Sequence, residues 1–156
     1  MALPKDAITG GCQCGAVRYA LEPKPYKIYV CHCLECQKQS ASAFGLSMPL
    51  KFEDLALEGE TAEYVRSTDS GARTRCIFCR QCGTRLYHRS DRSPEFVTIK
   101  AGTLDETHSI KPVAHIWVSR KQPWVVLDDD VPAYASQPPD LKGWRDELIG
   151  NSGRDK

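Results

Sequence analysis

The sequence lacks every feature that would direct the chain to a membrane or a polyanion. It has no run of about 18 consecutive apolar residues, so no segment is predicted to span a bilayer. The N-terminal MALPKDAITGG has neither a basic flank nor an apolar stretch, so it does not resemble a secretion signal. The formal net charge is only +1, which argues against recruitment of nucleic acid or an anionic membrane surface. These absences predict a cytoplasmic protein.

Several common catalytic patterns are also missing. We find no Ser-His-Asp arrangement with a nucleophile motif, no glycine-rich phosphate loop, and no pair of carboxylates in a supporting context. What the chain has instead is eight cysteines in 156 residues. A cytoplasmic protein keeps its thiols reduced, and neighbouring thiols one or two residues apart favour chelation over disulfide formation. The cysteines are therefore predicted to bind metal.

The fold is predicted to be mainly β, with short antiparallel strands and one short C-terminal helix. A length of 156 residues suits a single domain spanning 1–156. The helix is expected over 140–149, because two prolines precede this stretch and Gly150 follows it. Residues 10–15 are expected to form a glycine-rich turn, and 51–60 is mixed in character. Alternating and β-branched patterns predict strands over 16–21, 26–31, 44–50, 62–67, 73–78, 84–89, 96–101, 113–118 and 124–127.

Two cysteine pairs, each followed by glycine, are candidates for one closed site. Cys79 and Cys82 form a C-x-x-C-G knuckle, in which the glycine can adopt the left-handed conformation that such turns need. Cys12 and Cys14 form a C-x-C pair, which can chelate from the end of a strand because alternate side chains share a face. Together the pairs predict a tetrahedral four-cysteine structural zinc site.

A third cluster, Cys31, Cys33 and Cys36, remains one ligand short of a closed site. Three cysteine ligands leave the fourth position to water or to a substrate thiol, which is the condition for catalysis at zinc. If Cys76 joins the cluster, the site is closed and inert. The alternative is that Cys76, on a strand that turns it away from Cys79, is an ordinary buried free thiol.

An iron–sulfur protein is the rival interpretation of the eight cysteines. The C-x-C-x-x-C spacing differs from the C-x2-C-x2-C-x3-C-P run of bacterial ferredoxins, and no cysteine in this chain precedes a proline. The sequence therefore favours zinc, with two ions per chain.

Four segments resemble the signature blocks of the glutathione-dependent formaldehyde-activating enzyme family: GGCQCGAVRY, CHCLECQKQSASAF, FCRQCGTRLY and HIWVSRKQPWV. These blocks span about 10–124, leaving 125–156 as a C-terminal extension. The resemblance implies a β-tent type fold, related to the centromere protein V domain. It also implies a structural zinc on the four paired cysteines and a catalytic-type zinc on Cys31, Cys33 and Cys36. Cys76 has no counterpart among the family's ligands.

Other polar residues could surround the open site. His32 is expected to point away from its cysteine neighbours, as a surface or outer-sphere imidazole. His115 and Trp117 are expected on one face of a strand. Four residues after the cluster could line a pocket, although ordinary packing and capping explain their presence equally well: Gln39, Ser40, Ser42 and Phe44. Six arginines near Cys79 and Cys82 could bind substrate carboxylates or form a solvated face. They are Arg73, Arg75, Arg80, Arg85, Arg89 and Arg92.

The sequence is compatible with two kinds of function, an enzyme and a binding module. The first is a carbon–sulfur lyase in which the open zinc binds a thiol or thiol–aldehyde adduct; glutathione and formaldehyde are implied only by the resemblance. The second is a zinc-stabilised binding module without chemistry. The sequence assigns no catalytic acid or base.

Overall fold

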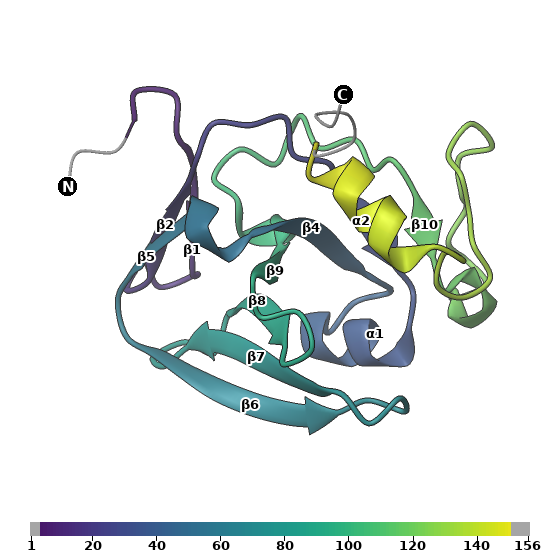
Figure 1. The fold of residues 1–156 in the computed structure, drawn as a ribbon, viewed down its shortest axis with the longest axis horizontal. Helices are drawn as coiled ribbons and strands as arrows, with labels where there is room; N and C mark the ends of the chain where they lie inside the picture. The colour runs from purple at the N-terminus through teal and green to yellow at the C-terminus, as the bar shows by residue number, and fades with distance from the viewer. Residues whose placement is uncertain (1–3, 151–156) are drawn as a thin grey trace. The chain divides into compact units, whose positions relative to one another are not determined.

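The computed structural model describes residues 4–150, which divide into two compact units. The first runs to Lys24 and includes Leu50–Ser109, and the second comprises Pro25–Pro49 and the chain from Ile110. The fold is mainly β with a short C-terminal helix, as predicted (Figure 1). That 1–156 forms a single domain stays a prediction, and the extreme C-terminal residues 151–156 lie outside the described part of the chain.

The first unit contains two groups of antiparallel strands. One group is a three-stranded sheet in the order β1-β2-β5, and the other runs in the order β9-β8-β7-β6. The longest pairing joins β6 to β7 over seven residue pairs, from Thr61–Cys79 to Ser67–Arg73. The strands are β1 (Ile8–Gly11), β2 (Arg18–Leu21), β5 (Leu55–Glu58), β6 (Thr61–Ser67), β7 (Arg73–Cys79), β8 (Arg85–Ser90) and β9 (Phe96–Lys100), with 3-10 turns η1 (Phe52–Asp54) and η2 (Ala101–Thr103).

Alternation along the strands builds the core of this unit. Leu86 in β8 and Ile99 in β9 are completely buried, and Val97 lies two residues before Ile99 on the same face. Thr74 and Cys76 in β7 are buried, while Arg73 before them and Arg75 between them are more exposed. The side chains on one face of each strand thus form the buried core of this unit.

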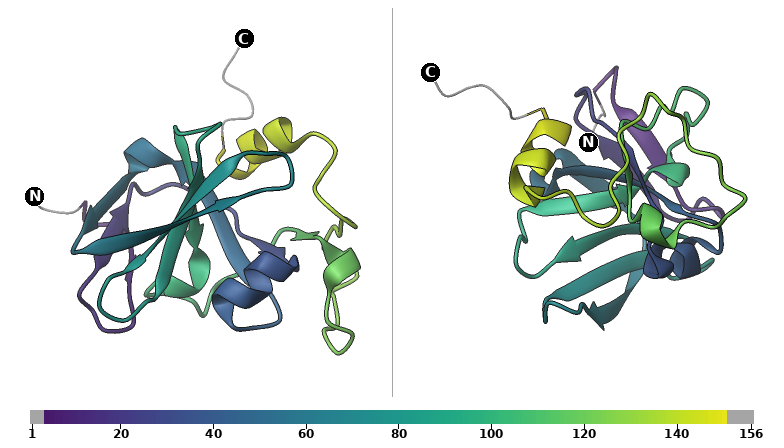
Figure 2. Two further views of the ribbon diagram at one scale, coloured as in Figure 1. Left: turned by 90° about the horizontal axis from the view of Figure 1, so that it is seen from below. Right: turned by 90° about the vertical axis from the view of Figure 1, so that its right-hand side faces the viewer.

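The second unit consists of a small sheet, two helices and long loops. β3 (Tyr29–Cys31) pairs antiparallel with β4 (Gly45–Lys51), and parallel with β10 (His115–Ile116). The parallel pair is an exception to the antiparallel prediction. Helix α1 (Leu34–Ser40) follows β3, and η3 (Val118–Arg120) follows β10. Figure 2 shows the stretch between η3 and α2 (Leu141–Leu148) as an extended loop.

Three predictions of local structure were wrong, and one strand was not expected. The glycine-rich segment at residues 10–11 belongs to β1, because Gly10 and Gly11 pair with Tyr19 and Arg18 of β2. The unexpected strand is β5, which lies within the mixed segment 51–60 and pairs with β2. The strand expected over 124–127 is irregular loop, and that over 113–118 shrinks to His115–Ile116. For β1 and β5, pairing with β2 decided the local conformation.

Gly59 offers a stability test of the turn before β6. Its φ is +108°, and a Cβ there would collide with the Ala16 carbonyl oxygen and lie 2.9 Å from Val17 Cα. We expect Gly59→Ala to lower the free energy of unfolding by about 3 kcal/mol, because strain and backbone overlap add. Gly71→Ala is the control: φ is +80° but the nearest neighbouring atom lies 3.9 Å away. If urea unfolding gave the same loss of stability for both variants, the close approach of the Ala16 and Val17 backbone to Gly59 would be contradicted.

Candidate metal centres

Four cysteines of the first unit bring their sulfur atoms together. The Sγ atoms of Cys12, Cys14, Cys79 and Cys82 all lie within 4.8 Å of one another. The Cys12–Cys14 separation is 3.5 Å and the Cys14–Cys79 separation is 3.8 Å. Cys12 and Cys79 are buried, whereas Cys14 and Cys82 are exposed, so the cluster lies at the protein surface.

Two turns ending in left-handed glycines place these sulfurs. Gly15 has φ +80° and donates its N–H to the Cys12 carbonyl over 3.1 Å. Gly83 has φ +76° and donates to the Cys79 carbonyl over 2.9 Å. The left-handed conformation predicted for Gly83 is therefore present. Cys12 directly follows the end of β1, and Cys14 lies in the turn that leads to β2.

Hydrogen bonds to sulfur fix the cluster from outside. The backbone N–H of Val17 donates to Cys12 Sγ over 3.2 Å. Thr84 Oγ1 lies 3.2 Å from Cys82 Sγ and also accepts the N–H of Gln13 over 3.1 Å, which ties the two turns together. The Thr84 hydroxyl lowers the pKa of Cys82 to about 5. This thiol is therefore predisposed to the thiolate form that metal ligation requires.

The spacing of the four sulfurs fits a single tetrahedral ion. With zinc–sulfur bonds of about 2.3 Å, the edge of a tetrahedron is about 3.8 Å long. The Cys12–Cys14 and Cys14–Cys79 separations, 3.5 and 3.8 Å, are close to that edge. They are far longer than a disulfide bond of about 2.05 Å, and all eight cysteines are free thiols. The donor set and its geometry therefore suit zinc.

The second unit contains a three-sulfur cluster. The Sγ atoms of Cys31, Cys33 and Cys36 lie within 4.8 Å of one another, at the junction of β3 and α1. Cys33 is the N-cap of α1, and its sulfur accepts the backbone N–H of Cys36 over 3.4 Å. Cys36 lies in the first turn of the helix. The C-x-x-C half of the motif is thus a helix start, which turns both side chains the same way.

Close packing and hydrogen bonding surround Cys36. Gln39 Nε2 donates to Cys36 Sγ over 3.3 Å. A side chain at Gly45 would lie 3.2 Å from Cys36 Cβ, so glycine at this position lets β4 pass close to the ligand loop. Of the four pocket candidates, Gln39 contacts a cluster sulfur and Phe44 packs edge-on against His32, with ring centroids 5.6 Å apart.

The close packing of the three thiols shifts their pKa values in different directions. Hydrogen bonds from Cys31 and then Cys36 lower the pKa of Cys33 to about 2. The same interactions with Cys33 and Cys36, together with burial, raise the pKa of Cys31. In the absence of a cation, a thiolate at Cys33 is stabilised by its two neighbours as donors. Three thiols this close together can all be deprotonated only when a cation compensates their charge, so the cluster is suited to a divalent cation.

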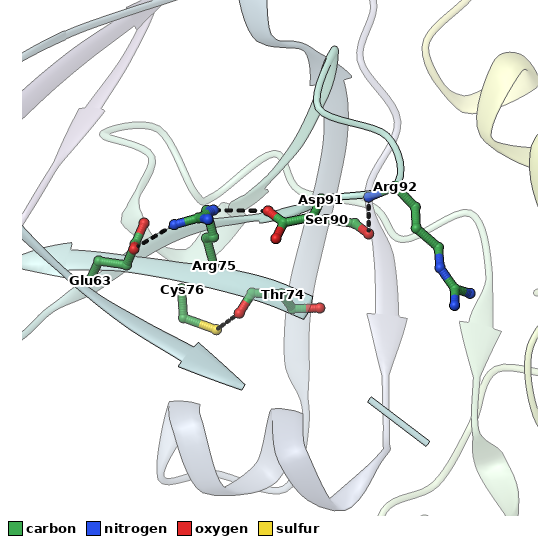
Figure 3. Close-up of polar contacts among 7 residues, drawn as sticks. All are labelled: Glu63, Thr74, Arg75, Cys76, Ser90, Asp91 and Arg92. Carbon is green, nitrogen blue, oxygen red and sulfur yellow. Dashed lines mark hydrogen bonds and ion pairs between the residues drawn. The ribbon is translucent and has the colours of Figure 1, made fainter. Parts of the chain in front are cut away.

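Cys76 belongs to neither cluster in the part of the chain that the structure describes. It is 2% exposed on β7, and its sulfur lies 3.9 Å from the Thr74 carbonyl oxygen. Figure 3 shows this thiol beside Thr74. Cys76 thus has the surroundings of a small buried hydrophobic residue, the simpler of the two interpretations of the sequence.

His32 is completely buried, which excludes the surface position allowed by the sequence. Its Nε2 lies 3.0 Å from Nδ1 of His115, and the rings stack with centroids 5.2 Å apart. Burial, and then the neighbouring His115, lower the pKa of His32 to about 4, so the ring is neutral near pH 7. Among the described residues, His32 Nδ1 has no hydrogen-bond partner. Sequence reasoning missed this histidine pair, because 83 positions separate its members.

Trp117 does not share a strand face with His115. Its backbone is left-handed, with φ 57° and ψ 37°, where the chain leaves β10 and begins η3. The side chain packs against Cys31, Cys36 and Ile116. A left-handed tryptophan is uncommon and costs of order 1–3 kcal/mol, which surrounding packing must offset. No sequence signal indicated this conformation.

Some of the arginines near Cys79 and Cys82 have partners within the first unit. Arg75 donates to Glu63 Oε1 and to Asp91 Oδ1, each over 2.8 Å (Figure 3). Arg92 donates to the Ser70 carbonyl over 2.8 Å, and Arg89 stacks over the Phe52 ring at 4.4 Å. Arg75 is therefore committed to internal carboxylates, which supports the solvated-face interpretation for this residue.

The fold and the two cysteine clusters define a mainly β protein able to hold two metal ions. Residues 7–120, more than half of the chain, match the family described as "Glutathione-dependent formaldehyde-activating enzyme". The chain belongs to this family. Its structure is also similar to the crystal structure of a Rhodobacter sphaeroides protein, with a TM-score of 0.52 and 21% identity. That similarity covers 65% of this chain and 92% of the other, and it concerns the fold alone.

Within the described residues, no helix is long and apolar enough to cross a bilayer.

Proposed function

We propose that this protein is a zinc-dependent carbon–sulfur lyase that acts on adducts between a thiol, such as glutathione, and an aldehyde, such as formaldehyde. The observation that carries the proposal is the three-sulfur cluster of Cys31, Cys33 and Cys36 in a member of this family. Within the described residues, no fourth cysteine, histidine or carboxylate completes that cluster. A cation held by three sulfurs retains one position for an exogenous ligand.

The four-cysteine cluster is proposed to hold a second, purely structural zinc. Its four sulfurs complete a tetrahedron, which leaves no position for a substrate. Both sets are compact enough to contact a single ion, whereas the thiolates of an iron–sulfur cluster are divided among several iron atoms and spread further apart. Two zinc ions per chain therefore account for seven of the eight cysteines. Eight free thiols also suit a reducing compartment such as the cytoplasm.

The proposed reaction makes or breaks one carbon–sulfur bond. In the addition direction the thiol sulfur attacks the carbonyl carbon, the carbonyl π electrons pass to oxygen, and the thiol proton ends on that oxygen. The reverse direction releases the aldehyde and restores the thiol. Zinc, when bound, would lower the pKa of a thiol in the fourth position and so favour its thiolate near neutral pH.

Residues around the cluster adjust its donor strength. The Gln39 amide donates to Cys36 Sγ, and the Cys36 backbone N–H donates to Cys33 Sγ. Each of these hydrogen bonds withdraws electron density from a sulfur ligand and fixes its orientation. They therefore offset part of the strong donation by three thiolates, which would otherwise make the site a weak electrophile. No residue is assigned as catalytic acid or base.

Magnetisation exchange between free glutathione, formaldehyde and their adduct provides the test. We expect protein containing two zinc ions per chain to raise the exchange rate of 13C-labelled formaldehyde at least tenfold over protein-free buffer. The control contains the same concentration of free zinc. Two bound zinc ions without acceleration, for formaldehyde and for larger aldehydes, would contradict the lyase proposal and favour the zinc-stabilised binding module.

A further inference from the structure

A shallow cavity of about 400 Å³, widely open to solvent, lies at the C-terminal end of α1, within the second unit. It follows directly from the helix that carries Cys36, and Ala41 ends that helix in a left-handed conformation with φ 49°. The volume lies in the range typical of small-molecule sites. The lining residues are Gln37, Lys38, Ala41, Ser42, Ala43 and Gln122.

Gln37 makes one wall of this cavity rigid. Its Nε2 donates both hydrogens, to the His32 carbonyl over 2.8 Å and to the Arg120 carbonyl over 3.0 Å. Its Oε1 accepts from Gln122 Nε2 over 3.1 Å. A glutamine amide has two N–H donors, so Gln37 has none left for a ligand. It serves to connect the cavity to the cysteine loop through His32.

Trp124 extends the same hydrogen-bonded chain to the surface. Its Nε1 donates to Gln122 Oε1 over 2.7 Å. The indole nevertheless remains 71% exposed, although tryptophan is usually highly buried. Gln122 retains one N–H donor after its bond to Gln37. A tethered aromatic ring with a free face thus stands next to a cavity-lining amide.

The chemistry of the lining favours a carboxylate. Lys38 is the one charged residue among the six, and the set contains no acidic side chain. Within the part of the chain that the structure describes, Lys38 forms no ion pair. Ser42 and the remaining N–H of Gln122 add neutral donors, while Ala41 and Ala43 keep the floor small and apolar.

We propose that this cavity is the specificity subsite for a carboxylate of the thiol substrate. Lys38 pairs with the carboxylate, and the exposed face of Trp124 packs on the uncharged backbone of the same molecule. The inference rests on the proposed function, because it assumes that the thiol binds at the neighbouring three-cysteine cluster. The protein accordingly prefers a thiol with a free carboxylate over its neutral ester.

Glutathione and glutathione diethyl ester, titrated into the cobalt-substituted protein, separate thiol binding from carboxylate recognition. Both probes carry the same thiol, which the visible absorption of cobalt reports. In the parent, the ester is expected to bind several-fold more weakly. Lys38→Gln should reduce this preference about threefold, as expected for one partly exposed ion pair. Lys142→Gln, the same charge change on the exposed surface of α2, should retain the parent preference.

Trp124→Leu provides a second and different prediction. It should weaken glutathione and the ester by the same factor, about threefold, because the indole contacts the uncharged part of both. An unchanged ester preference in Lys38→Gln would overturn the subsite, even with normal thiol binding. Unchanged affinities in Trp124→Leu would overturn the role of the indole. If neither probe alters the cobalt spectrum of the parent, the proposed thiol site itself is wrong.

Discussion

Replacing Cys79 with serine is expected to unfold or aggregate the protein. Cys79 is completely buried at the end of β7, and its sulfur belongs to the four-cysteine cluster. Structural zinc contributes about 10–16 kcal/mol of apparent binding free energy in small zinc domains. That exceeds or equals the whole stability of an ordinary domain, about 5–15 kcal/mol. Thermal unfolding with parallel zinc analysis should show loss of the cooperative transition together with one zinc per chain.

Cys76→Ser is the matched control for this experiment. Cys76 lies on the same strand, is 2% exposed and undergoes the same atom replacement, but belongs to neither cluster. Its hydroxyl should cost about 1–3 kcal/mol and leave both zinc ions bound. Cys14→Ser, at an exposed ligand, should remain soluble enough to measure but lose metal to a weak chelator. A Cys79→Ser protein with parent-like thermal stability would refute the division of the cysteines.

Replacing Cys33 with serine should abolish thiol binding while leaving the fold intact. Cys33 is only partly buried, and it contributes a sulfur to the three-cysteine cluster. Loss of an outer-sphere partner already lowers metal affinity about 10–100-fold, so loss of a ligand should exceed this. We therefore expect the glutathione Kd to rise by more than about 100-fold in calorimetry. Exchange of formaldehyde with its glutathione adduct should fall to the rate of protein-free buffer.

The thermal unfolding of the Cys33→Ser variant distinguishes this result from general damage. Its transition should remain cooperative, because the first unit keeps its own four-cysteine cluster. Zinc content should fall from two ions towards one. Cys76→Ser again serves as the control and should bind glutathione like the parent. Parent-like glutathione binding by Cys33→Ser would place the thiol site elsewhere.

Regular local patterns were sufficient to predict much of the secondary structure. The strand expected over 96–101 is β9, and the helix expected over 140–149 is α2. Both are recognisable because β-branched alternation and flanking proline or glycine act within a few residues of the element. β1 and β5 escaped prediction because their strand conformation depends on pairing with β2, and not on their own composition.

The surroundings of the three-cysteine cluster were much less predictable. Trp117 adopts a left-handed backbone that no bulky side chain favours by itself. His32 was expected to have a surface or outer-sphere position, and its burial and contact with His115 depend on β10 lying parallel to β3. Such contacts join residues about 80 positions apart. Their formation is decided by sheet pairing, which short-range patterns do not encode.

By itself, the sequence determined the chemistry of this protein: reduced thiols in two Gly-followed pairs and one C-x-C-x-x-C run, in a family recognisable from four segments. Spacing is enough for this because neighbouring thiols can reach one ion only through a tight turn or a helix start. The tertiary structure brings Cys12 and Cys14 to Cys79 and Cys82, as the pairs predict, and it alone decided that Cys76, which the sequence left open, stays apart. Both outcomes depend on which strands pair and which way each side chain faces, because a buried thiol ligates only where the sheet turns it towards its partners.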